Sequence, residues 1–436
     1  MRDSMSLAHH LARVADLDTM PPAGEVIRTV GLLVESAGPR ASVGDVCELV
    51  HADGAPGLPV QVVGFRDRVL LSVPLGDTAG IRPGSRIVAR SGSVSVPVDE
   101  SLLGRVLDPL GHPLDGLPLR ARSRYPLFPP PLNPMDREPV VTALATGVRS
   151  IDGMLTCGRG QRIGLFGGSG VGKSTLLGML TRGSSADVIV LGLVGERGRE
   201  LKTFLERDLG PEGRRRSVVI VSTSDHPPLM RMRAAYAATA VAEYFRDQGK
   251  HVLLLMDSVT RFAMAQREVG LAAGEPPTTK GYPPSVFALL PALLERAGAV
   301  CGRGSITAMY TVLVEGDDQN EPIADAVRSI LDGHVVLSRD LAARQHYPPV
   351  DVLQSVSRTM PDCVPPEHRR KAGQVREWLS AIRNSEDLVS VGAYVEGSNP
   401  AIDQARAKQT AIDGFLRQDA EDRCAYDDAI ARLGAL

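Results

Sequence analysis

The most informative segment of the sequence is Gly167-Gly-Ser-Gly-Val-Gly172-Lys173-Ser174-Thr175. It follows the apolar run Arg162–Phe166, which is typical of a buried strand, and it precedes the apolar helical run Thr175–Leu180. The spacing GxxxxGK[ST] between a strand and a helix is the phosphate-binding P-loop motif. Its glycines allow successive backbone N–H groups to curve around phosphate oxygens, and the helix N-terminus adds a favourable dipole. The stretch therefore predicts an α/β domain that binds a nucleotide.

All nine residues of the motif are expected to contact the nucleotide. Within it, the Lys173 ammonium would reach the β- and γ-phosphates of ATP, and the Ser174 hydroxyl would bind Mg²⁺. The expected nucleotide-binding residues are Gly167, Gly168, Ser169, Gly170, Val171, Gly172, Lys173, Ser174 and Thr175.

Short apolar runs alternate with helical stretches on both sides of this motif, from about Val140 to Val350. Strands that alternate with helices in this way predict a doubly wound parallel sheet. The helical stretches include Leu229–Arg246, Ser285–Arg296 and Ile323–Leu331. The expected strands are Arg162–Phe166, Asp187–Leu193, Ser217–Ser222, His251–Met256, Ile306–Val314 and His334–Leu337.

The regions before and after this α/β segment have different patterns of apolar residues. Short β-rich runs separated by Gly, Pro and Asp turns predict a small β-barrel or sandwich; they are Val26–Val34, Val46–Val50, Val60–Phe65, Val69–Val73 and Arg86–Ala89. After Pro365 the pattern is helical, in Glu367–Arg383, Ala401–Arg417 and Asp419–Arg432. We therefore expect four parts: a helical tail at 1–25, a β-barrel at 26–95, the nucleotide-binding domain at 96–363 and a helical domain at 364–436. The tail would be an amphipathic helix with the apolar residues Leu7, Leu11, Val14 and Leu17. A Pro-rich connector at 126–139, within the nucleotide-binding domain, would be extended and surface-lying.

The composition sets limits on function. The 436 residues carry 49 Lys+Arg against 51 Asp+Glu, a net charge of −2, which argues against a surface built for nucleic acid. The five cysteines are far apart and form no CxxC pair, which favours a reducing cytosol over a disulfide framework. No apolar run approaches the roughly 20 residues that a membrane-spanning helix requires.

Other polar residues stand at chemically suggestive positions. Asp257 ends the apolar run His251–Met256, where an acid beside a P-loop would hold the Mg²⁺ shell. Glu196 and Glu200 follow Asp187–Leu193, and either carboxylate could polarise an attacking water; spacing alone does not rank them. On pattern alone, Tyr347 would be a packing residue and Arg358 a surface charge.

Taken together, these motifs resemble the hexameric RecA-like ATPases of the rotary ATP synthase superfamily, and within it the export ATPases of bacterial type III secretion, flagellar or injectisome. The runs MDSVTRFAMAQRE (256–268) and KGYPPSVF (280–287) are specific to the export branch. The resemblance covers nearly all of the chain beyond about residue 25. Its segments are 104–116, 145–175, 192–200, 244–298, 304–342, 346–358 and 392–403.

The resemblance implies a role for each of several residues. Glu196 would be the catalytic carboxylate that orients the water, with Arg197 beside it, and Lys173 would act on the phosphates. Arg358 would be an arginine finger that reaches across a subunit interface onto a neighbour's γ-phosphate. Tyr347 is similar to the aromatic that stacks on adenine, and Asp317-Asp318 lies in the loop that approaches a central channel in relatives.

The resemblance also implies partners and a place in the cell. The chain would assemble into a homohexamer. Its other partners would be a stator protein at the N-terminal helix, a central stalk protein, export chaperones with their secreted substrates, and an export gate at the inner membrane. The chain would be cytoplasmic and peripherally associated with that membrane. ATP hydrolysis would energise protein export by releasing chaperones and unfolding substrates, and the run TKGYPPSVFALLP (279–291) favours a flagellar system.

Three other functions are weighed against export. A catalytic subunit of a rotary ATP synthase needs the same nucleotide site, but lacks the export-type runs around Asp257 and Tyr282. A Rho-like RNA translocase needs stacking aromatics, yet Phe65 is the only aromatic residue between Val26 and Ala89. A non-catalytic subunit would tend to lack the carboxylate at Glu196.

Overall fold

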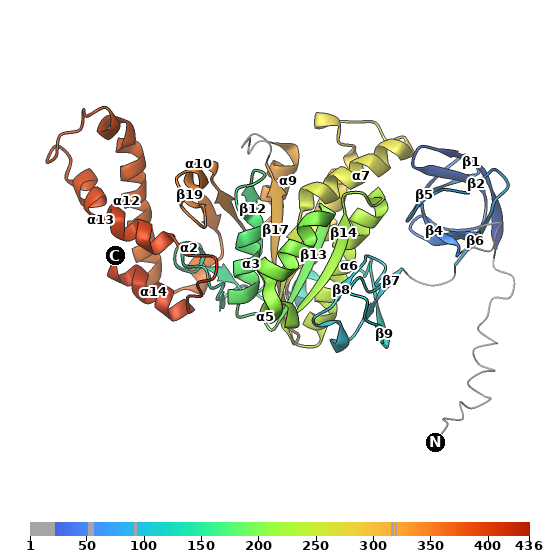
Figure 1. Ribbon diagram of the computed structural model, residues 1–436, viewed down its shortest axis with the longest axis horizontal. Coiled ribbons are helices and arrows are strands. Elements are labelled where there is room, and N and C mark those ends of the chain that lie inside the picture. Colours follow the sequence, from blue (N-terminus) through green and yellow to red (C-terminus); the bar gives the residue numbers. More distant parts are fainter. Residues whose placement is uncertain (1–21, 51–55, 91–93, 315–317, 319–320) are drawn as a thin grey trace, which may run out of the picture. The chain divides into compact units, whose positions relative to one another are not determined.

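The structure is a computed structural model that describes residues 22–50, 56–90, 94–314, 318 and 321–436 (Figure 1). The expected tail helix with Leu7, Leu11, Val14 and Leu17, and also Asp317, lie outside the described residues. The chain divides into two compact units. Of the described residues, one unit contains those from Pro22 to Val94 together with Ala272–Gly274, and the other contains those of Ser95–Leu271 and Glu275–Leu436.

The first unit is a closed antiparallel barrel with the strand order β1-β2-β5-β4-β3-β6, drawn as the blue ring in Figure 1. Inward-pointing apolar side chains fill it, among them Val34, Cys47 and Ile87. The expected single run Val26–Val34 is in fact a hairpin, because Gly31 has a positive φ of 57° and reverses the chain. The strands are β1 (Ala23–Val30), β2 (Leu33–Ala37), β3 (Val46–Leu49), β4 (Leu58–Arg66), β5 (Val69–Pro74) and β6 (Arg86–Ala89).

The second unit is built on a nine-stranded sheet with the order β19-β18-β12-β17-β15-β13-β14-β8, and β16 beside β17. The pairs are parallel except β18 with β19 and β16 with β17. The strands are β8 (Val106–Leu107), β12 (Arg162–Gly167), β13 (Val188–Glu196), β14 (Ser217–Thr223), β15 (His251–Asp257), β16 (Gly298–Ala299), β17 (Ser305–Leu313), β18 (Gly333–Leu337) and β19 (Val350–Ser357).

Two small two-stranded sheets accompany the large one, β7 (Ser95–Val98) with β9 (Ser123–Pro126) and β10 (Ala143–Leu144) with β11 (Cys157–Gly158). The Pro-rich connector that follows β9 is only partly on the surface. Phe128 is exposed, but Leu127 is buried and its carbonyl accepts a hydrogen bond from Arg296. The expectation of a wholly surface-lying connector is therefore wrong at Leu127.

Helices connect the strands and form the C-terminal part of the chain. The helices before β19 are α2 (Arg149–Met154), α3 (Lys173–Gly183), α4 (Gly198–Thr203), α5 (Gly210–Arg215), α6 (Pro228–Asp247), α7 (Val259–Ala273), α8 (Pro284–Leu294), α9 (Pro322–Ile330) and α10 (Arg339–Ala343), with a π-helical segment at Phe204–Leu209 and 3₁₀ turns at Glu100–Leu102, Pro134–Asp136 and Thr279–Gly281. After β19 come α11 (Met360–Cys363), α12 (Pro366–Ser390), α13 (Pro400–Leu416) and α14 (Tyr426–Ala435).

The expected helix Asp419–Arg432 begins later, at Tyr426. Gln418 holds the preceding segment in a non-helical path, because its backbone N–H donates to Tyr347 O and its side-chain amide bonds to Gly147 O and Asp422 O. The helices α12, α13 and α14 share one apolar core with the sheet, which includes Trp378, Phe415 and Leu433.

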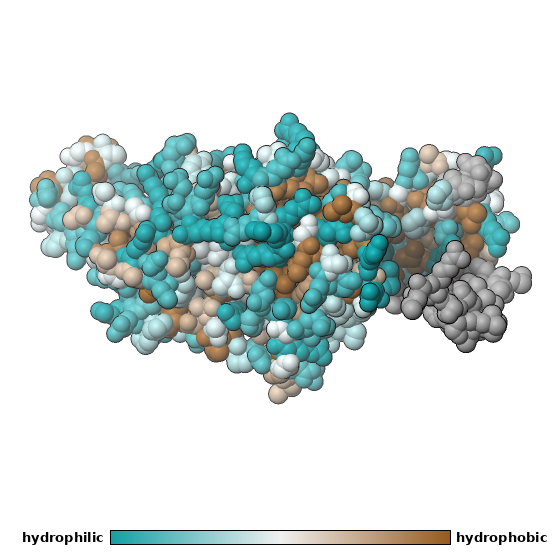
Figure 2. Space-filling model, turned by 60° about the horizontal axis from the view of Figure 1, so that its bottom comes forward, coloured by the Kyte–Doolittle hydropathy of each residue, from teal (hydrophilic) through white to brown (hydrophobic). Residues whose placement is uncertain are grey.

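The expected fold class is confirmed: a nucleotide-binding α/β core with an N-terminal β-barrel and a C-terminal helical region. In the part of the chain that the structure describes, no helix is both long and apolar enough to cross a lipid bilayer. The face drawn in Figure 2 is mainly hydrophilic, with scattered hydrophobic residues among the polar ones.

Candidate active site

The P-loop lies between the end of β12 and the start of α3, as its spacing predicts. Gly170 and Gly172 have φ values of 78° and 100°, a left-handed conformation that favours glycine. No side chain caps α3 at Gly172, so the first N–H groups of the helix are left for a bound anion.

Lys173 is buried and lies over its own loop. Its Nζ donates hydrogen bonds to the carbonyls of Gly167 at 2.8 Å and Gly168 at 2.6 Å. Burial lowers the pKa of this ammonium, while the nearby carboxylates of Asp257 and Glu196 oppose the shift. The Lys173 cation is thus placed close to Asp257 and Glu196, two of the three acidic residues that the sequence singles out.

Asp257 ends β15, two strands away from β12 in the sheet. It is buried, and burial raises the pKa of its carboxyl, against the effects of the Thr311 hydrogen bond, Lys173 and Arg261. The Thr311 hydroxyl donates to Asp257 Oδ1 at 2.5 Å. The peptide bond between Asp257 and Ser258 is cis.

Glu196 is the last residue of β13, and an irregularity in that strand directs its side chain to a cavity beside the P-loop. The register with β14 shifts between Val194 and Glu196, and Gly195 between them has a φ of 71°. Glu196 is half-buried; desolvation, with the nearby charge of Asp257, raises its pKa to about 7. A carboxylate with this pKa can accept a proton from water at neutral pH.

Glu200, on α4, has different surroundings. It is exposed and forms an ion pair with Arg197 at 3.2 Å, a side chain that is itself exposed. The structure therefore separates the two carboxylates that spacing could not rank: Glu196 is desolvated and close to Lys173, whereas Glu200 is solvated and paired.

These residues surround one cavity of about 730 Å³ at the carboxyl ends of the parallel strands. This edge of a parallel sheet is where α/β proteins bind their ligands. The cavity is lined by Ser169, Gly170, Gly172, Lys173, Ser174, Thr175, Glu196, Arg197, Glu200, Asp257, Thr260, Arg261, Met264, Leu313, Val314 and Arg339.

The oxygen donors in this cavity suit a hard divalent cation. Ser174 and Asp257 line it together, and both also line an adjoining cavity of about 420 Å³. A hydroxyl and a carboxylate, completed by water and phosphate oxygens, form the type of shell that Mg²⁺ prefers. The residues present therefore fit a Mg²⁺ ion bound with the nucleotide.

Tyr347 lies beside the P-loop and is 43% exposed. A Cβ atom on Gly172 would lie 3.8 Å from the Tyr347 ring, so this ring borders the same loop as the phosphate-binding residues. The Tyr347–Pro348 peptide bond is cis, and β19 begins directly after it at Val350.

Arg358 is not among the residues that line the cavity. It follows the end of β19, where Ser357 pairs with Gly333 at the start of β18, and its N–H donates to Asp332 O. The P-loop follows the carboxyl end of β12, which runs parallel to β18. The two ends of the five-residue strand β18 are about 15 Å apart. Arg358 is exposed and lies at the end of β18 and β19 that is opposite to the P-loop.

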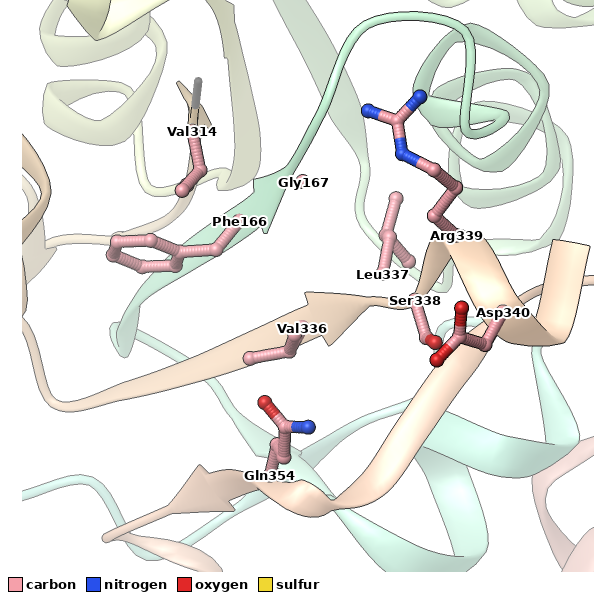
Figure 3. A pocket seen from close by; sticks show the side chains of 9 residues that line it. All are labelled: Phe166, Gly167, Val314, Val336, Leu337, Ser338, Arg339, Asp340 and Gln354. Carbon is pink, nitrogen blue, oxygen red and sulfur yellow. The ribbon is translucent and has the colours of Figure 1, made fainter. Parts of the chain in front are cut away.

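Six cavity residues were not identified as site residues from the sequence, and two of them are arginines. Arg261 on α7 lies close enough to Lys173, Glu196 and Asp257 to influence their pKa values. Arg339 begins α10 and borders both the main cavity and a smaller one of about 170 Å³. In Figure 3 its guanidinium points away from Asp340 and Gln354, toward the loop after Gly167. Arg261 lies in the export-type run 256–268 and Arg339 in the segment 304–342, but neither has a spacing that relates it to the P-loop, and only the fold brings them there.

The fold and this cavity define a P-loop nucleotide hydrolase of the ATP synthase type. The sequence matches the ATP synthase alpha/beta family, nucleotide-binding domain, over residues 147–357 and the T3SS EscN ATPase C-terminal domain over residues 364–435. It is 52% identical to the flagellum-specific ATP synthase of Bacillus subtilis over 422 residues, 96% of each chain. It is 49% identical to the type 3 secretion system ATPase of Xanthomonas euvesicatoria, over 94% of this chain and 93% of the relative.

Solved structures agree with this assignment. The assembled ATPase EscN from the enteropathogenic E. coli type III secretion system superposes with a TM-score of 0.89 at 43% identity, over 94% of this chain and 98% of that one. EscN in complex with its central stalk EscO gives a TM-score of 0.87. The chain therefore belongs to the family of flagellar and type III secretion ATPases.

Proposed function

We propose that this chain hydrolyses MgATP in a homohexameric ring that energises protein export, in a flagellar system. The observation that carries the proposal is the convergence of Lys173, Glu196 and Asp257 in one cavity, with Arg358 at the opposite end of β18 and β19. Family membership supports hydrolysis, and the export-type run at 279–291 supports the flagellar assignment.

Each residue has a defined task in the proposed reaction. The P-loop N–H groups and Lys173 bind the β- and γ-phosphates, and the Tyr347 ring packs on the adenine. Ser174 and Asp257 would hold Mg²⁺, which when bound neutralises developing phosphate charge. Glu196 orients the attacking water and accepts its proton, because it is the half-buried carboxylate whose pKa lies near neutrality. Arg197 lies beside it at the cavity wall.

The position of Arg358 supports assembly. An arginine at the end of β18 and β19 opposite to the P-loop cannot reach its own P-loop, but it can reach that of a neighbour in a ring. An arginine finger supplied in this way is worth about 10³–10⁵ in rate. We therefore propose that the hexamer is required for turnover, and that Arg358 completes the neighbour's site.

The proposed partners follow the same family. The complex of EscN with its stalk EscO supports a central stalk partner for this chain. We further propose a stator protein at the N-terminal helix, chaperones that carry secreted substrates, and an export gate at the inner membrane. In this setting the ring would be cytoplasmic and peripheral to that membrane, and hydrolysis would release chaperones and unfold substrates.

The test combines a purified protein with its host. Purified chain should hydrolyse ATP only with Mg²⁺. A host that lacks the gene should lose swimming if the system is flagellar, and should lose effector secretion if it is an injectisome. Re-expression of wild-type protein should restore the lost trait and Lys173→Ala should not. Retention of both traits in the deletion strain would contradict the export function.

A further inference from the structure

Thr311 is a polar residue inside the most buried part of the sheet. It lies on β17, which runs between the P-loop strand β12 and the Asp257 strand β15. Its Cα pairs with Leu165 of β12, and the neighbouring Tyr310 pairs with Met256 of β15. Its exposed fraction is 0%. Thr311 is therefore held between the two strands that carry the nucleotide-binding motifs.

A hydroxyl at this position is costly unless it is hydrogen-bonded. Met309, two residues earlier on the same face, belongs to an apolar core that also contains Leu165 and Leu255. A valine would fill almost the same volume without burying a polar group. The Thr311 hydroxyl donates to Asp257 Oδ1, and this is the one hydrogen bond that the described residues give the Asp257 carboxylate.

A second contact fixes the same strand end to the segment that follows Asp257. The Leu313 N–H donates to the Thr260 hydroxyl at 2.9 Å, and Thr260 lines the main cavity. Two hydrogen bonds, Thr311 to Asp257 and Leu313 to Thr260, therefore connect the end of β17 with the segment from Asp257 to Thr260. The carboxylate cannot rotate about its broad terminal torsion without breaking the Thr311 bond.

We propose that Thr311 is a positioning residue for Asp257, holding one carboxylate oxygen so that the carboxylate keeps a single orientation toward the Mg²⁺-nucleotide. The inference rests on the proposed metal-binding role of Asp257. Thr311 would thus contribute to the affinity for Mg²⁺ as well as to the packing of the core. Loss of the hydroxyl should weaken Mg²⁺ binding more than it weakens the fold.

The test measures binding without turnover. Full-length wild-type protein and the variants Thr311→Val, Thr311→Ser and Thr307→Val are titrated with Mg²⁺ at a fixed concentration of a fluorescent ADP, and anisotropy gives the half-saturating Mg²⁺. Thr307 is a matched control, because it is also buried on this face of β17 but bonds the Gly160 N–H, about 13 Å from Thr311 along the strand. Thermal unfolding without nucleotide or Mg²⁺ measures the fold.

We expect Thr311→Val to raise the half-saturating Mg²⁺ by about tenfold to a hundredfold, as the loss of one hydrogen bond to a charged group predicts. Thr311→Ser should stay within about twofold of wild type, and Thr307→Val should lower the unfolding temperature without moving the Mg²⁺ midpoint. A folded Thr311→Val with an unchanged midpoint would overturn the inference. So would a Thr311→Ser as weak as Thr311→Val, because the role would then belong to packing.

The variant Asp257→Asn distinguishes a failure of the proposed metal role of Asp257 from a failure of the inference about Thr311. If this variant also leaves the Mg²⁺ midpoint unchanged, the proposed metal role of Asp257 fails. If Asp257→Asn raises the midpoint and Thr311→Val does not, only the inference about Thr311 fails.

Discussion

Glu196 and Glu200 are four residues apart, and their surroundings give them different chemistry. Glu196 is half-buried beside Lys173 and Asp257, whereas Glu200 is solvated and paired with Arg197. A general base must have a pKa near the working pH and must face the reacting water. These surroundings favour Glu196 over Glu200 for the catalytic role that we propose.

The first prediction compares the two carboxylates. Glu196→Gln should bind fluorescent ADP as wild type does and lose roughly 100-fold or more in kcat, because it keeps the shape but not the proton acceptor. Glu200→Gln should stay within about threefold in kcat, since an exposed ion pair contributes little. Steady-state ATPase assays check both variants. A larger loss in Glu200→Gln than in Glu196→Gln would exchange their roles.

The second prediction concerns pH. Burial and the charge of Asp257 raise the pKa of Glu196 to about 7. Below that pH the carboxyl of the free enzyme is protonated and cannot accept a proton, so kcat/KM should fall as the pH drops from 8 to 6. A pH profile of kcat/KM for the wild-type enzyme tests this. A flat profile through this range would contradict Glu196 as the base in its observed surroundings.

At the scale of elements, β13 and β19 position the groups of the site. The irregularity at Gly195 turns the end of β13 so that Glu196 meets the cavity. β19 begins beside its own P-loop, just after Tyr347, and its opposite end lies next to Arg358. If Tyr347 and Arg358 have the proposed roles, β19 connects the nucleotide site of its own subunit with that of a neighbour.

The third prediction tests the bend in β13. Gly195→Ala should cost about 1–2 kcal/mol of stability, because an alanine is strained at a φ of 71°. Its Cβ would also lie 3.2 Å from Arg261 Cβ, so the aim of Glu196 should change and kcat should fall by roughly tenfold. Thermal unfolding and ATPase assays measure both effects.

Gly249→Ala is the matched control for this variant. Gly249 has a φ of 80° at the exposed end of α6, with open space around it. It should therefore lose a comparable amount of stability and keep its kcat. Equal losses of kcat in the two variants would show that the bend at Gly195 has no specific effect on catalysis.

The sequence predicts some of these elements and not others, for physical reasons. The P-loop is a local motif, so its strand, turn and helix follow from spacing. The rank of Glu196 over Glu200 depends on a strand irregularity that periodicity does not reveal. Thr311 and Arg261 become site neighbours only when the sheet forms, and the helix before Tyr426 is prevented by Gln418, which bonds to residues far away in sequence.

In the whole molecule, Lys173, Glu196 and Asp257 lie together in one cavity, and Arg358 lies outside it at the opposite end of β18 and β19. We propose that these two groups are halves of different sites in a ring. Among the described residues, none from the helices α12, α13 and α14 lines the main cavity. We therefore propose that a single subunit is an incomplete enzyme, and we expect activity to depend on assembly.

The fourth prediction follows from this incompleteness. Specific ATPase activity should rise with protein concentration and level off once rings are complete, because each added neighbour supplies an Arg358. Activity measured over a dilution series, with mass measured by light scattering at each point, tests the link. Constant specific activity in samples that scatter as monomers would contradict a shared site.

Mixing two inactive variants tests the shared site most directly. Arg358→Ala lacks the finger but keeps its own P-loop, and Lys173→Ala lacks the P-loop cation but keeps the finger. In mixed rings, some interfaces pair an intact P-loop with an intact Arg358. We predict that each variant alone is nearly inactive and that the mixture regains a substantial fraction of wild-type ATPase activity, highest near equal amounts. If the variants are shown to co-assemble and every mixture remains as inactive as its components, the account of a site completed by a neighbour is wrong.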